Sequence, residues 1–180
     1  MPTTTQAPAN NVRDSKLNEF FIDQLQDIYW AEQKLVKTLP KLEEAAHSAE
    51  LRQAFNHHLQ ETRNHVSRLE KAFDLIGEPA QSKKCHAMAG IADEGEAIID
   101  ETEENTAQRD VGLIFAGQKA EHYEIATYGG LVQLAKTLEY NDVAELLAVT
   151  LAEEKNADIT LTKIAEAGIN GQAKEELKED

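Results

Sequence analysis

Residues 58–73, HLQETRNHVSRLEKAF, decide the fold, because they place charged side chains on the apolar face of a helix. A period of 3.6 residues puts one line of side chains on the same face: Ala54, His58, Glu61, His65, Leu69, Ala72 and Ile76. Within this line Glu61 and His65 lie one turn apart. A carboxylate in a core must be protonated, paired with a cation or bound to a metal. The stretch therefore predicts a core-facing helix that carries a candidate metal-binding pair.

Three other stretches of helical period repeat this anomaly. The period predicts long helices over about 15–47, 49–77, 108–138 and 141–168, and a short helix in CHAMAGIADEGEAIIDE, residues 85–101. Each of the other three long helices also has acids on or beside its apolar line. The candidate acids are Glu32 in the first helix, Glu121 and Glu124 in the third, and Glu154 and Asp158 in the fourth.

The connections between these helices define the fold class. The links at 47–49 and 139–141 are short and predict antiparallel hairpins, whereas residues 78–107 form one long crossover. We therefore expect an all-α, ferritin-like four-helix bundle whose crossover, between the second and third helices, carries a short extra helix. Gly77, with Pro79 beyond it, marks a helix end.

Several residues predict the local detail of these helices. Ser15 and Asn141 are candidate N-caps, and Gly168 is the expected end of the fourth helix. Pro40 falls inside the first helix and is expected to kink or split it. Gly129 and Gly130, which are costly within a helix, predict a kink, a bulge or a close helix contact.

Composition limits the classes of function. The chain has 180 residues and a net charge of -15, which disfavours nucleic acid and anionic membranes as partners and favours metal cations. We expect a flexible tail at 1–14, one bundle domain at 15–168 and a flexible acidic tail at 169–180. A single cysteine, Cys85, and the lack of a signal peptide predict a cytoplasmic protein.

The spacing of the acids predicts that they meet. Glu61 follows Glu32 by 29 residues, and Glu154 follows Glu124 by 30. Residues placed symmetrically about a hairpin turn lie at the same height, so the acids of each hairpin face each other. Clustered carboxylates repel by several kcal/mol unless cations neutralise them. Two divalent ions per chain would do so.

Di-iron and di-manganese carboxylate bundles have such a site, with one Glu from each of two helices and Glu-x-x-His from each of the other two. Here Glu32 and Glu124, with Glu121, are the single acids, and the pairs are Glu61/His65 and Glu154/Asp158. Oxygen-rich ligation favours Fe, with Mn as the alternative. The pairs are spaced i+4, and Asp158 stands where a second His is expected. Whether His65, Asp158 and Glu121 bind metal directly or support a ligand stays open.

Other polar residues near these positions have more ordinary interpretations. His57 and His58 lack a matched acid at their height, so we assign them to the surface or to packing. Glu153 is offset from the inner line and is assigned to the surface. Tyr128 is expected to pack in the core, with a redox role as the alternative, and Cys85 is an ordinary thiol.

Four segments together resemble the YciF/YciE family of ferritin-like bacterial stress proteins: DIYWAEQKLVKTLPKLEEAA, HLQETRNHVSRLEKAF, AEHYEIATYGGLVQLA and LAEEKNADITLTKIAEAG. The resemblance covers about residues 15–168. It implies a ferritin-like four-helix fold, dimerisation, a dinuclear metal site and a link to stress responses. By position it transfers the family's acids to Glu32, Glu61, Glu121, Glu124, Glu154 and Asp158, with His65 as a further metal residue.

These observations lead to one hypothesis and two rivals. The favoured function is redox detoxification at a di-metal site of a homodimer, with peroxide or oxygen as substrate. The first rival is a non-catalytic iron-binding protein. The second is a structural or regulatory stress protein whose metal site is vestigial.

Overall fold

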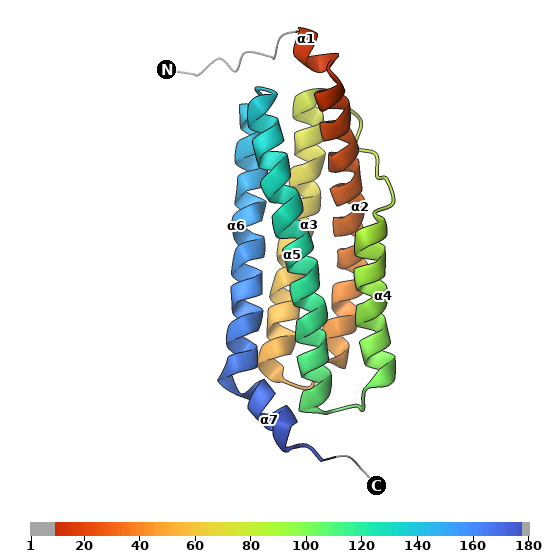
Figure 1. Ribbon diagram of the computed structural model, residues 1–180, viewed down its shortest axis with the longest axis vertical. Coiled ribbons are helices and arrows are strands. Elements are labelled where there is room, and N and C mark those ends of the chain that lie inside the picture. The colour runs from red at the N-terminus through yellow and green to blue at the C-terminus, as the bar shows by residue number, and fades with distance from the viewer. Residues whose placement is uncertain (1–9, 178–180) are drawn as a thin grey trace.

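The computed structural model describes residues 10–177, in which every regular element is a helix. The elements are α1 (Asn10–Arg13), α2 (Lys16–Ala45), α3 (Ala49–Ile76), α4 (His86–Glu101), α5 (Ala107–Thr137), α6 (Asn141–Ile164), the π-helix η1 (Ala165–Ile169) and α7 (Asn170–Glu175). Helices α2, α3, α5 and α6 form the bundle, and α4 packs outside it against α2 and α5 (Figure 1). The predicted fold class is confirmed. None of the helices in the described residues is long and apolar enough to cross a membrane.

The chain direction alternates as the two predicted hairpins require. Helix α2 runs down the bundle and α3 returns, and α5 runs up and α6 returns (Figure 1). The crossover between the hairpins descends along the outside and includes α4. Helix α3 packs on α6, and α2 on α5, so the four helices close a ring around one core.

The helix ends follow from local capping chemistry. The Ser15 hydroxyl accepts a hydrogen bond from the Asn18 N–H at 3.1 Å, as expected for the N-cap of α2. Gly77 ends α3 with a φ of 79°, a left-handed conformation that costs little only for glycine. The Cys85 sulfur accepts a hydrogen bond from the Met88 N–H at 3.3 Å and caps α4. At α6 the N-cap position is Tyr140 and not Asn141.

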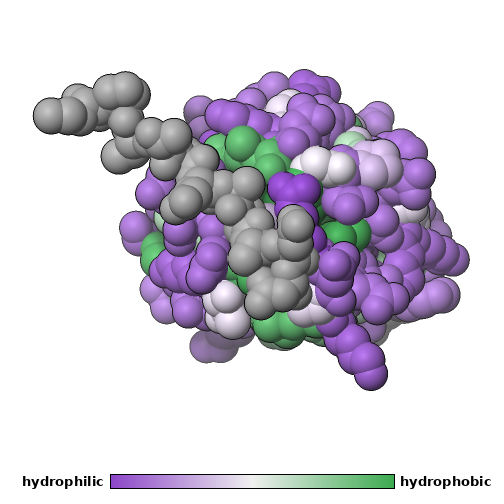
Figure 2. Space-filling model, turned by 90° about the horizontal axis from the view of Figure 1, so that it is seen from above, coloured by the Kyte–Doolittle hydropathy of each residue, from purple (hydrophilic) through white to green (hydrophobic). Residues whose placement is uncertain are grey.

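The core consists of apolar side chains on both sides of a polar layer. Along α2, Phe21, Leu25 and Ile28 precede Glu32, and Leu35, Leu39 and Leu42 follow it, all of them buried. Burial of each such side chain contributes roughly 1.5–3 kcal/mol. Viewed from above, the end of the molecule shows mainly hydrophilic side chains with a few hydrophobic ones between them (Figure 2). The polar layer around Glu32 is therefore held rigidly by apolar packing from above and below.

The two helices in which an irregularity was expected are both continuous. Helix α2 continues through Pro40, so Pro40 does not split it. Pro40 is exposed while Leu39 and Leu42 are buried, and packing of that face holds the helix across the missing hydrogen bond. Helix α5 also continues through Gly129 and Gly130, and apart from their own helical backbone and chain neighbours no atom of the described residues lies within 4 Å of a Cβ built at either position. Within residues 10–177, no close contact with another helix explains these glycines.

The C-terminal end continues beyond the predicted helix. Helix α6 ends at Ile164, and η1 and α7 carry the chain across the lower end of the bundle toward α5 (Figure 1). The Glu176 carboxylate accepts hydrogen bonds from the N–H groups of Ala107 and Gln108 at 2.7 and 2.8 Å. Helix and cap thus occupy much of the segment expected to be a tail. Residues 178–180 lie outside the described residues.

The N-terminal segment 1–14 was also expected to be a tail. Residues 1–9 lie outside the described residues, and Asn10–Arg13 form the single turn α1.

Candidate metal centre

Two groups of buried histidine and glutamate side chains meet where α2, α3, α5 and α6 pack together. The first, the His65 cluster, contains Glu32, His65 and Glu154. The second, the His58 cluster, contains His58, Glu121, Glu124 and Glu154. Within each cluster the ligand atoms all lie within 4.8 Å of one another. Glu154 belongs to both clusters, and the two imidazole rings lie 6.2 Å apart.

In the His65 cluster one imidazole nitrogen faces the carboxylates. His65 Nδ1 lies 2.9 Å from Glu154 Oε1 and 3.4 Å from Glu32 Oε1. The other nitrogen, Nε2, lies 3.0 Å from Glu153 Oε2. The Tyr128 hydroxyl donates a hydrogen bond of 2.5 Å to Glu32 Oε1 and fixes that side chain. The Glu153 carboxylate therefore positions the His65 ring, and the Tyr128 hydroxyl positions Glu32.

The His58 cluster has the same organisation with the nitrogens exchanged. His58 Nε2 lies 3.2 Å from Glu121 Oε1 and 3.8 Å from Glu154 Oε2. His58 Nδ1 points outward and lies 3.5 Å from Glu61 Oε2. Glu154 thus presents Oε1 to His65 and Oε2 to His58. Glu154 is therefore the residue that could contribute an oxygen to a cation in either cluster.

The clusters contain polar atoms that the protein itself leaves unsatisfied. Five buried carboxylate oxygens of the clusters have no hydrogen-bond partner: Glu32 Oε2, Glu121 Oε2, both oxygens of Glu124, and Glu154 Oε2. Each buried polar atom without a partner costs about 1–3 kcal/mol, and more if it is charged. Carboxylate oxygens that converge without partners beside two imidazole rings fit divalent Fe or Mn. The residues present therefore fit the dinuclear metal that the family resemblance implies.

The charges of the clusters shift their acid–base equilibria. Burial, reinforced by the negative charge of Glu154, raises the pKa of Glu121 and of Glu124 well above the ordinary value. Burial also raises the pKa of Glu32. For His65 burial opposes protonation, but contacts with Glu154 and Glu32 outweigh it and raise the pKa to about 10. Without a bound cation the site therefore retains protons that a metal would displace.

Five of the seven predicted residues lie in the clusters: Glu32, His65, Glu121, Glu124 and Glu154. Glu61 and Asp158 lie beside the clusters and are more exposed, with side chains 17% and 22% accessible. Glu61 contacts His57 and His58. Asp158 accepts a hydrogen bond from Gln118 at 3.0 Å and lies 3.3 Å from His122. The structure does not bring these two acids into either cluster.

Two residues of the centre were not assigned to it from the sequence. His58 is buried at the floor of its cluster, and Glu153 contacts His65. Hairpin symmetry matches residues within one layer only, so it gives His58 no partner acid. His58 lies two turns from His65 on the same apolar line, and this spacing is the sequence signal for a second layer of buried ligands. Glu153 had no such signal, because it lies off that line.

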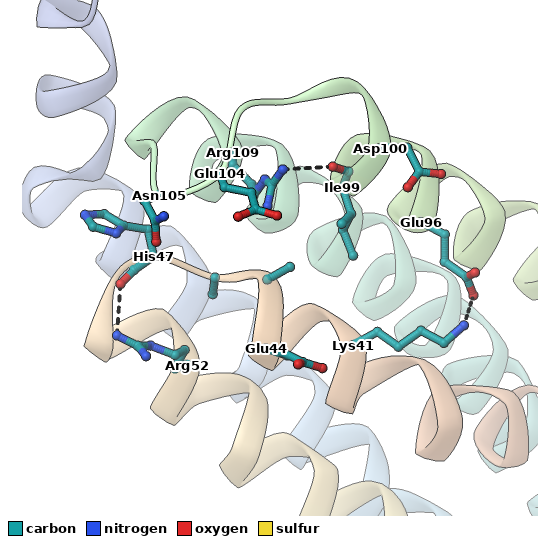
Figure 3. A pocket seen from close by; sticks show the side chains of 12 residues that line it. Lys41, Glu44, His47, Arg52, Glu96, Ile99, Asp100, Glu104, Asn105 and Arg109 are labelled. Atoms are coloured by element: carbon teal, nitrogen blue, oxygen red, sulfur yellow. Dashed lines mark hydrogen bonds and ion pairs between the residues drawn. The ribbon is translucent and has the colours of Figure 1, made fainter.

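A cavity of about 560 Å³ lies elsewhere, at the end of the bundle where α2 ends (Figure 3). Its cationic side chains already have partners within the chain. Lys41 pairs with Glu96, Arg52 donates to the His47 carbonyl, and Arg109 donates to the Ile99 carbonyl (Figure 3). This cavity contributes nothing to the buried clusters.

Fold and site define the class: a helical bundle whose core holds converging carboxylates and histidines able to bind metal ions. The sequence profile of the family described as "Domain of unknown function (DUF892)" matches residues 16–174. Protein YciF of Escherichia coli K12 is 42% identical over 158 residues, which cover 87% of this chain and 95% of YciF.

Solved structures agree with this comparison. The crystal structure of the E. coli stress protein YciF matches with a TM-score of 0.82 and 41% identity, covering 87% of this chain and 98% of that one. YcfI of Rhodopseudomonas palustris matches with a TM-score of 0.79 and 34% identity, covering 83% of this chain and 96% of YcfI. The chain belongs to the DUF892 family and is similar to YciF over most of its length, so the resemblance seen in the sequence is confirmed.

Proposed function

We propose that this protein binds two ions of Fe, or alternatively Mn, in the two clusters and uses them to remove peroxide or oxygen under stress. The observation that supports the proposal is the set of five buried carboxylate oxygens without hydrogen-bond partners, which converge with two histidines from four helices. The similarity to a stress protein of E. coli supports the stress context. The proposal includes a homodimer in the cytoplasm.

The residues divide between the two positions as the distances suggest. Glu32 and His65 would hold one ion, and His58, Glu121 and Glu124 the other. Glu154 would contact both, because its two oxygens face different histidines. Glu61 and Asp158 lie at the border of the clusters, and each would become a metal ligand if its side chain turned inward.

Several residues would position the ligands and move protons. The Glu153 carboxylate beside Nε2 of His65 favours a proton on that nitrogen, and leaves Nδ1 free to donate to a cation. Glu121, Glu124 and His65 would release protons when a cation binds. Tyr128 keeps Glu32 oriented toward the cluster. A bound Fe or Mn pair would supply the redox electrons for reduction of peroxide or oxygen.

The experiment loads the protein with Fe(II), or separately Mn(II), without oxygen and then follows the loss of added hydrogen peroxide. The loaded protein is expected to consume peroxide faster than the same concentration of free metal. Glu124→Gln is expected to abolish this excess, because it removes a charged donor from the His58 cluster. Equal rates for wild type, variant and free metal would contradict the redox function.

A structural role is the second candidate, because such a role has been suggested for YcfI. It predicts that Glu124→Gln loses metal yet complements a deletion strain under stress as well as wild type does. The other rival, iron binding without catalysis, predicts stable loading with no peroxide turnover. Storage of an iron mineral needs a closed protein cage, so a dimeric mass measured by light scattering would exclude mineral storage.

A further inference from the structure

The two clusters differ in how they meet the surface. Both have a histidine with one nitrogen facing inward and the other directed toward an outer carboxylate, Glu61 for His58 and Glu153 for His65. The outer carboxylates, however, have different surroundings. Glu61 borders a pocket, whereas Glu153 is held by the guanidinium group of Arg68.

On the His58 side a pocket of about 40 Å³ lies between α3 and α6. One water needs about 10–15 Å³, so the pocket can hold water or an incoming ion. His57 and Glu61 line it, and His57 is 71% exposed. His58 and Glu121 of the buried cluster line it as well. The outward nitrogen of His58, Nδ1, is buried and has no hydrogen-bond partner.

On the His65 side the outer carboxylate is fixed. Arg68 Nη2 donates to Glu153 Oε1 at 2.9 Å, and Arg68 Nη1 donates to the other oxygen of Glu153. Arg68 Nη1 also donates to the Thr150 hydroxyl at 3.2 Å. A bidentate Arg–carboxylate pair resists displacement better than the longer contacts of Glu61, which lies 3.4 Å from His57 Nε2 and 3.5 Å from His58 Nδ1. His65 itself is fully buried beneath this pair.

We propose that metal ions enter and leave through the pocket at His58, so that the His58 position exchanges quickly and the His65 position retains its ion. Glu61 attracts the cation at the surface, and His58 and Glu121 receive it from the pocket floor. The Glu153–Arg68 pair covers the His65 position and prevents rapid exchange of its ion. The inference rests on the proposed metal centre and adds a direction of loading and an order of release.

The test is kinetic and uses Mn(II) alone as the probe. The sole tryptophan, Trp30, lies two residues before Glu32, so quenching of its fluorescence after rapid mixing reports loading. Release is followed by adding excess chromogenic chelator to the loaded protein. For wild type we expect one ion to leave in a fast phase and the other in a slow phase.

Ala157→Phe narrows the pocket without altering a proposed ligand, since Ala157 lines the pocket and lies outside both clusters. Loading and the fast release phase should slow by about tenfold or more, because ions would then pass only through local opening of the bundle. The amount of Mn(II) bound at equilibrium should stay unchanged. The matched control is Ala152→Phe on the exposed face of the same helix, which should leave both rates as in wild type.

The outcomes separate the two proposals. If wild type binds no Mn(II) at equilibrium, the metal centre itself is wrong. If wild type binds Mn(II) but Ala157→Phe loads as fast as Ala152→Phe, the centre stands and the pocket route is wrong. Should Ala157→Phe not fold, Glu61→Gln provides the same test, with slower loading expected and an unchanged rate contradicting the route.

A second variant addresses the closed position. Arg68→Gln removes the bidentate partner of Glu153 and should accelerate the slow release phase while the fast phase keeps its rate. An unchanged slow phase would show that Arg68 and Glu153 do not retain the ion.

Discussion

At the scale of single residues, Glu124 shows the conflict between stability and binding most clearly. Both of its carboxylate oxygens are buried without a hydrogen-bond partner, and burial raises its pKa. Such a group destabilises the folded state of the metal-free protein. A bound cation would compensate for that cost.

Glu124→Gln therefore has two expected effects of opposite sign. In chelator the melting temperature should rise, because a neutral amide replaces a buried acid of similar shape. Affinity for Mn(II) should fall by about 10-fold or more, in line with the loss of a metal-site residue. Thermal melts with and without Mn(II), and equilibrium binding, measure the two effects. A variant that melts lower in chelator and binds Mn(II) normally would make Glu124 a structural residue.

The titrating groups predict opposite pH dependences for the two states. The pKa values of Glu121 and Glu124 are raised from 4.5, and that of His65 is raised from 6.5 to about 10. A raised pKa contributes stability that is present below the unfolded value and is lost as pH rises. The metal-free protein should therefore lose stability from about pH 5 toward pH 9.

Metal binding should follow the opposite trend. The same groups must release protons to bind a cation, so affinity for Mn(II) should increase over this pH range. Calorimetry in buffers of different ionisation enthalpy counts the released protons, and melts in chelator give the stability trend. Binding without proton release at neutral pH would contradict the protonation states described above.

At the scale of elements, side chains from one helix cap the ends of another. Asp110 on α5 is buried and accepts hydrogen bonds from the N–H groups of His47 and Ser48, both at 2.7 Å, at the start of α3. Glu176 caps the start of α5 in the same way but is exposed. The Asp110 contact joins the two hairpins, and the Glu176 contact fastens the C-terminal segment to the start of α5.

Asp110→Ala should lower the free energy of unfolding by about 2–3 kcal/mol, because it leaves two N–H groups without their charged acceptor. Glu176→Ala is the matched control and should cost about 1 kcal/mol or less, since water can replace an exposed cap. Urea denaturation of both variants in chelator gives the comparison. Equal losses of unfolding free energy in the two variants would mean that burial does not strengthen the hydrogen bonds of Asp110.

The sequence predicted the elements well where local chemistry sets them. Ser15, Gly77 and the helical period act over a few residues, and they located α2 and α3 within one or two positions. The caps by Asp110 and Glu176 act through space between distant segments, so no local pattern announced them. The same distinction applies to the site: hairpin symmetry identified Glu32 and Glu154, whereas the approach of His58 to Glu121 depends on how the two hairpins pack.

At the scale of the whole molecule, all four bundle helices supply charged side chains to the buried clusters. Glu32, His65, Glu121, Glu124 and Glu154 come from four helices, so repulsion among ionised carboxylates would destabilise the bundle and a shared cation would offset it.

Global stability should therefore depend on metal. A ligand at 100 times its dissociation constant adds about 2.7 kcal/mol per site if the unfolded chain does not bind it. For a domain of this size that corresponds to a rise of roughly 5–10 °C in melting temperature. Scanning calorimetry with and without Mn(II) measures it, and Mg(II) serves as the control for ionic strength. Equal melting temperatures in Mn(II) and in chelator would show that the clusters do not bind the ion.

The central claim is that the two clusters hold two ions that share Glu154, and anomalous diffraction from crystals grown with Mn(II) tests it most directly. Data collected above and below the manganese absorption edge locate each ion without reference to activity. We predict two peaks per chain, one among Glu32, His65 and Glu154 and the other among His58, Glu121, Glu124 and Glu154. Peaks only at the surface, or none in the bundle core at saturating Mn(II), would contradict the claim.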